Sequence, residues 1–119
     1  MDHLEAEVRR QCGAWNLELR FVADFALATV EVATNVMEHS GAHWIEVQLE
    51  KQAASVGLSI RDDGEAFDSV EMASYFDAPV AHLGLDRHMG LYIIGRLDFE
   101  KTYRRLEPGV NELTFKRAL

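Results

Sequence analysis

Three segments of this sequence carry residue types that could bind a metal ion and a phosphorylated ligand. In the first segment, Glu31, Asn35 and His39 follow one another at intervals of four residues. On an α-helix this spacing places the three side chains in one stripe on a single face. Such a stripe can hold a metal ion and a phosphate, so we expect a functional face on this helix.

The other two segments place glycines where a ligand could approach the backbone. Asp62-Asp63-Gly64 ends an apolar run that is typical of a strand, and His88-Met89-Gly90-Leu91 leads into the apolar residues of a short helix. A carboxylate beside a glycine after a strand, together with the stripe on the helix, suggests a binding site for ATP. The sequence contains no G-x-x-x-x-G-K-[ST] motif, which counts against a P-loop enzyme.

Length and composition limit the remaining choices. The 119 residues are enough for one domain, predicted to span residues 1–119, with a sizeable core. The net charge of −8 argues against duplex nucleic acid as a direct partner, because such binders need a basic footprint. The single cysteine, Cys12, allows no internal disulfide, and neither a signal peptide nor a membrane span is evident. We therefore expect a cytoplasmic protein that does not bind membranes.

The first half of the chain predicts two helices. Apolar residues at steps of three and four indicate a short amphipathic helix that ends near Gly13, and Asn16 is placed to cap a second, longer helix. The second helix should stop at Ser40-Gly41, since glycine suits the left-handed position after a helix end. Its apolar residues spread around most of its circumference, so we expect a largely buried helix on which Glu31 and Asn35 must find partners.

The second half predicts strands. Apolar and polar residues alternate over 45–50 and 56–61, which indicates a hairpin, and two further strands around 97–103 and 110–115 are joined by a turn at Glu107-Pro108-Gly109. Asp62 continues the apolar face of its strand, whereas Asp63 points the other way. The stretch 69–89 is long enough to be a ligand-covering loop, and 91–94 reads as a short buried helix.

This order of elements predicts a two-layer α/β (α+β) sandwich, with helices on one face of a mixed, mainly antiparallel sheet. The E-x-x-x-N-x-x-x-H helix, the D-x-G box and the glycine-leucine box together resemble the Bergerat-type ATP-binding fold shared by histidine kinases and gyrase. The resemblance runs from about Leu4 to Leu119. Within that fold the sequence is most similar to the anti-sigma-factor serine/threonine kinases of bacterial partner-switching systems.

The resemblance implies a role for each motif. Glu31 would be the general base, Asn35 would bind Mg²⁺ through its amide oxygen, and Asp62 would recognise adenine, with Arg87 as an additional candidate near the phosphates. The ATP-binding residues implied in this way are Asn35, His39, Asp62, Gly64, Ala66, Met89, Gly90 and Leu91.

The family also implies partners. A kinase of this kind phosphorylates a small anti-anti-sigma protein of the STAS type, sequesters a sigma factor, and is expected to form a homodimer. His88 stands where the family usually has glycine, and this departure motivates an alternative, a degenerate nucleotide-binding or non-catalytic module that acts by holding a partner. A third interpretation, the ATP domain of a larger sensor kinase, ranks below both.

Overall fold

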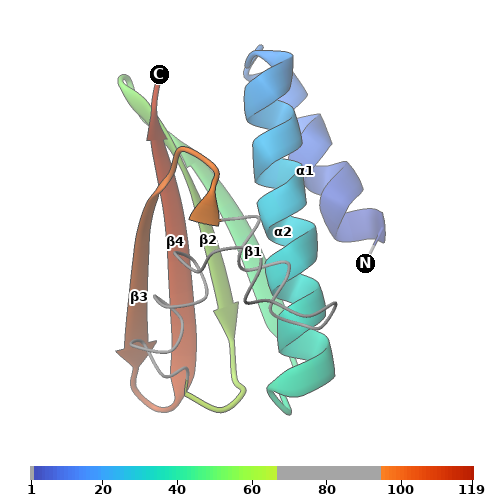
Figure 1. The fold of residues 1–119 in the computed structure, drawn as a ribbon, viewed down its shortest axis with the longest axis vertical. Helices are drawn as coiled ribbons and strands as arrows, with labels where there is room; N and C mark the ends of the chain where they lie inside the picture. The colour runs from blue at the N-terminus through green and yellow to red at the C-terminus, as the bar shows by residue number, and fades with distance from the viewer. Residues whose placement is uncertain (1, 67–94) are drawn as a thin grey trace.

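A computed structural model of the chain describes residues 2–66 and 95–119 (Figure 1). Its helices and strands are α1 (Asp2–Ala14), α2 (Leu19–His39), β1 (Ile45–Lys51), β2 (Ser55–Asp62), β3 (Glu100–Leu106) and β4 (Val110–Ala118). The predicted covering loop at 69–89, the predicted helix at 91–94 and the predicted glycine-leucine box lie outside the described residues. None of the helices in the described part of the chain is long and apolar enough to cross a membrane.

The four strands form one sheet in the order β1-β2-β4-β3, and every pairing among them is antiparallel. Figure 1 shows α1 and α2 on the same side of this sheet, with α2 running along it. The predicted two-layer sandwich with helices on one face is therefore confirmed.

The core lies between α2 and the sheet, where alternation along the strands directs apolar side chains. In the register of β2 and β4, Leu58 is opposite Phe115 and Ile60 is opposite Leu113. The same alternation carries one step further along each strand and places Asp62 opposite Asn111. Both of these polar residues are buried on the helix-covered face, so the prediction from parity for Asp62 is confirmed.

The helix ends differ from the sequence-based expectation at one point. Gly41 has a φ of 70° and follows the last residues of α2, as predicted. Asn16, in contrast, does not cap α2: it has a φ of 60°, and its backbone N–H donates to the carbonyl of Gly13. Asparagine tolerates the left-handed conformation, so here it ends the turn after α1 instead of starting the next helix.

Helix α2 is also less enclosed than its composition predicts. Phe25, Ala28, Val32 and Val36 form a fully buried face, but Met37 is 59% exposed. α1 and the sheet both contact α2, but they cover only part of its circumference and leave Met37 outside these contacts.

Candidate functional site

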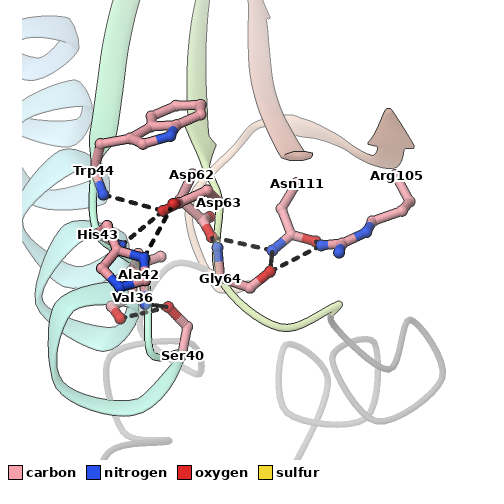
Figure 2. Close-up of polar contacts among 10 residues, drawn as sticks. All are labelled: Val36, Ser40, Ala42, His43, Trp44, Asp62, Asp63, Gly64, Arg105 and Asn111. Carbon is pink, nitrogen blue, oxygen red and sulfur yellow. Dashed lines mark hydrogen bonds and ion pairs between the residues drawn. The ribbon is translucent and has the colours of Figure 1, made fainter. Parts of the chain in front are cut away.

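The D-x-G turn directly follows β2 and is held by hydrogen bonds to the Asp62 carboxylate. The backbone N–H of Gly64 donates to Asp62 Oδ1 over 2.8 Å, and the side-chain amide of Asn111 donates to the same oxygen over 3.0 Å (Figure 2). Asp62 is 1% exposed. A buried carboxylate needs such donors to offset the loss of its hydration, and here they fix the position of Oδ1.

Asn111 uses both ends of its amide in this network. Its Oδ1 accepts from the Tyr103 hydroxyl at 2.8 Å and from Arg105 at 2.9 Å. Its Nδ2 donates to Asp62 and also to the carbonyl of Glu65 at 2.8 Å. Strand β4 thus supplies a fully paired amide that connects the outer strand β3 to the D-x-G turn.

The same turn is attached to the end of α2. The backbone N–H of Glu65 donates to the carbonyl of Ser40 over 2.9 Å, and the Ser40 hydroxyl donates to the carbonyl of Val36 over 2.6 Å. A Cβ on Gly64 would lie 2.3 Å from Ser40 Oγ and 2.8 Å from Ser40 O. Glycine is therefore required here by the close approach of the turn to the helix end. This reason differs from the approach of a ligand to the backbone that the sequence suggested.

Asp63 fastens the loop between α2 and β1 to this turn. Its Oδ1 accepts from the backbone N–H of His43 at 2.7 Å and of Trp44 at 3.0 Å (Figure 2). The hydrogen bond from Trp44 is the main reason why the pKa of Asp63 is lowered, and the bonds from His43 act in the same direction, because N–H donors favour the ionised carboxylate. Asp62 and Asp63 are thus both engaged and do not form a solvated acidic turn.

Glu31, Asn35 and His39 lie on the last turns of α2, directly before this attachment at Ser40. Glu31 and Asn35 are partly buried on the helix, and His39 is its last residue. Asn35 Oδ1 is buried and has no hydrogen-bond partner among the described residues. An acceptor oxygen in this state fits a hard cation such as Mg²⁺, which prefers oxygen ligands.

Residues 2–66 and 95–119 contain no group of three or more His, Cys, Asp and Glu side chains arranged to hold a metal ion. A cation at Asn35 would therefore draw on this amide together with oxygens of a phosphorylated ligand, which is the way Mg²⁺ is usually bound in nucleotide sites. The residues present fit that kind of site.

The structure brings together some of the residues predicted from the sequence. Gly64, which donates to Asp62, lies against the helix end that follows Asn35 and His39. Exposed Ala66 comes two residues later and is the last described residue before 95. Arg87, His88, Met89, Gly90 and Leu91 fall outside the described residues.

Sequence reasoning missed three residues that hold the D-x-G turn, namely Tyr103, Arg105 and Asn111. A signal for Asn111 was present, because it is a polar residue that continues the alternation of Leu113 and Phe115, as Asp62 does on β2. Only the strand register shows that these two polar positions face one another.

Comparison with known proteins gives the class of this fold and site. The family model described as histidine kinase-like ATPase domain matches residues 2–117, so the chain belongs to the histidine kinase-like ATPase family. The histidine kinase AdeS from Acinetobacter baumannii has a similar structure, with a TM-score of 0.55 at 16% sequence identity. That match covers 82% of this chain and 46% of the AdeS chain. No curated protein matches the sequence.

Proposed function

We propose that the chain binds ATP with Mg²⁺ and transfers the γ-phosphate to a serine or threonine of a small STAS-type antagonist protein, in the manner of an anti-sigma-factor kinase. Membership of the histidine kinase-like ATPase family and the two-layer fold support the nucleotide-binding part. The observation that carries it is the buried Asn35 Oδ1, which has no hydrogen-bond partner among the described residues. Asn35 lies one turn before the end of α2, where the helix meets the D-x-G turn.

In this proposal each element of the site has one task. Asp62, held by Gly64 and Asn111, accepts a hydrogen bond from the exocyclic amine of adenine. Asn35 holds Mg²⁺ through Oδ1, and the bound ion would neutralise charge on the phosphates.

Glu31, one turn before Asn35, is the general base. The acceptor hydroxyl oxygen forms a bond to the γ-phosphorus while the bond from that phosphorus to the ADP oxygen breaks, and the hydroxyl proton passes to the Glu31 carboxylate. Positioning of the acceptor and neutralisation of charge supply most of the acceleration.

The partners follow from the sequence resemblance. When the antagonist is absent, the chain would sequester a sigma factor. The same resemblance implies that the chain would form a homodimer. The departure at His88 supports the alternative, a non-catalytic module that holds a partner without turnover.

Calorimetric titration with ATP, in the presence and absence of Mg²⁺, tests the nucleotide site. We expect Mg²⁺-dependent binding by the wild type, loss of that dependence in Asn35→Ala, and no change in Gln48→Ala, which removes an exposed amide on the opposite face of the sheet. Failure of the folded wild type to bind ATP would contradict the proposal.

Phosphate transfer from ATP to a small STAS-type protein tests the catalytic part. Glu31→Gln should retain ATP binding and lose transfer, because the amide is nearly isosteric but does not accept the proton. Undiminished transfer by Glu31→Gln would remove the general-base assignment. Binding of ATP without transfer by the wild type would favour the non-catalytic module.

A further inference from the structure

Arg105 lies on the outer strand β3 and makes two hydrogen bonds through one nitrogen. Its Nη1 donates to the carbonyl of Gly64 over 2.9 Å and to Asn111 Oδ1 over 2.9 Å, and Figure 2 shows the three groups side by side. Gly64 O is the carbonyl of the D-x-G glycine itself. One cation therefore contacts both the backbone of the turn and the amide that holds Asp62.

The donors and acceptors of this network follow a single direction. Arginine has only donors, so Asn111 must present its oxygen to Arg105 and its N–H₂ group to Asp62. The Tyr103 hydroxyl could donate or accept and would not impose this orientation by itself. A chain of hydrogen bonds thus runs from the guanidinium of Arg105 through the amide of Asn111 to the buried carboxylate of Asp62, and each bond polarises the next.

We propose that Arg105 is a positioning residue for base recognition: through Asn111 and Gly64 it fixes Asp62 so that its carboxylate reads the exocyclic amine of adenine. This inference rests on the proposed function and adds a determinant of nucleotide specificity to it. Arg105 acts on the ligand only through Asp62. Its removal should therefore weaken the recognition of the amine more than the binding of the triphosphate.

The test compares ATP with purine riboside 5′-triphosphate, which lacks the exocyclic amine, by calorimetry in Mg²⁺. The wild type should bind ATP at least about tenfold more tightly, as expected for a hydrogen bond to a charged group. Arg105→Ala should reduce this ratio by roughly fivefold, mainly through weaker ATP binding. The ratio is measured within one preparation, so a smaller folded fraction of a variant does not change it.

Two further variants separate positioning from stability. Arg105→Lys should regain part of the ratio, because one ammonium can donate to Gly64 O without making both bonds in the same geometry. Arg104→Ala is the matched control. Arg104 pairs with Glu112 and, by the alternation along β3, lies on the face of the sheet opposite to Arg105, so its loss should leave the ratio unchanged.

The outcomes distinguish this inference from the proposed function. A wild type that binds ATP but shows a ratio near one, or an Arg105→Ala variant with the wild-type ratio, overturns the role of Arg105 and leaves ATP binding intact. A folded wild type that binds neither nucleotide overturns the proposed function and this inference together.

Discussion

Replacing Gly64 with alanine should destabilise the protein through a contact with the end of α2. The new Cβ would lie 2.7 Å from Ser40 Cβ and 2.8 Å from Ser40 O, well inside the ordinary contact distance of about 3.5 Å. The Ser40 hydroxyl could rotate away, but its carbonyl belongs to the backbone. The D-x-G turn must therefore move away from the helix.

The magnitude follows from three contributions. Overpacking at a close contact costs about 1–3 kcal/mol, and weakening of the hydrogen bond from Glu65 to Ser40 O adds about 1 kcal/mol. The lower backbone entropy of the unfolded alanine chain returns about 0.4–1 kcal/mol, because Gly64 does not occupy the left-handed region that alanine avoids. We expect the free energy of unfolding to fall by about 2–3 kcal/mol.

Urea unfolding followed by circular dichroism measures this change. Gly57→Ala is the matched control, since the nearest atom to its new Cβ is Phe115 O at 4.0 Å, and it should be neutral or slightly stabilising. Adding Ser40→Gly to Gly64→Ala removes two of the three close contacts and should show a favourable coupling of about 1 kcal/mol in a double-mutant cycle. A Gly64→Ala protein within about 0.5 kcal/mol of the wild type would refute the reasoning.

Two further predictions concern charged groups. The folded-state pKa of Asp63 is lowered, first by the Trp44 N–H. The difference in free energy of unfolding between the wild type and Asp63→Asn should therefore be fully present above the unfolded pKa of about 3.9, and it should decline as the pH falls through the lower folded pKa. A difference that is independent of pH from 6 to 2 would contradict this prediction. Arg117→Met should lower the free energy of unfolding by about 2–4 kcal/mol, measured in urea, because the buried guanidinium lies 4.3 Å from the Phe99 ring centroid and 2.8 Å from the Asp24 carboxylate. Combining Asp24→Asn with Arg117→Met should recover part of that loss. An Arg117→Met protein as stable as the wild type would show that the ion pair and the ring contact contribute nothing to stability.

Local patterns in the sequence were sufficient for most of the fold. The periods of the two helices and the alternation of the strands predicted the elements and the buried side of β2, and Gly41 marked the end of α2 as expected. Asn16 was assigned to the wrong helix, because asparagine suits both an N-cap and a left-handed turn and the sequence does not distinguish them.

Some features of the candidate site could be predicted from the sequence, and others could not. The spacing of Glu31 and Asn35 and the parity of Asp62 are properties of one helix and one strand, so the sequence alone determined them. The pairing of Asp62 with Asn111, the bridge from Arg105 and the contact of Gly64 with Ser40 join residues from separate elements. Strand register and helix packing decide such contacts, and both depend on how the whole core closes, so only the tertiary structure could decide which side chains hold the D-x-G turn.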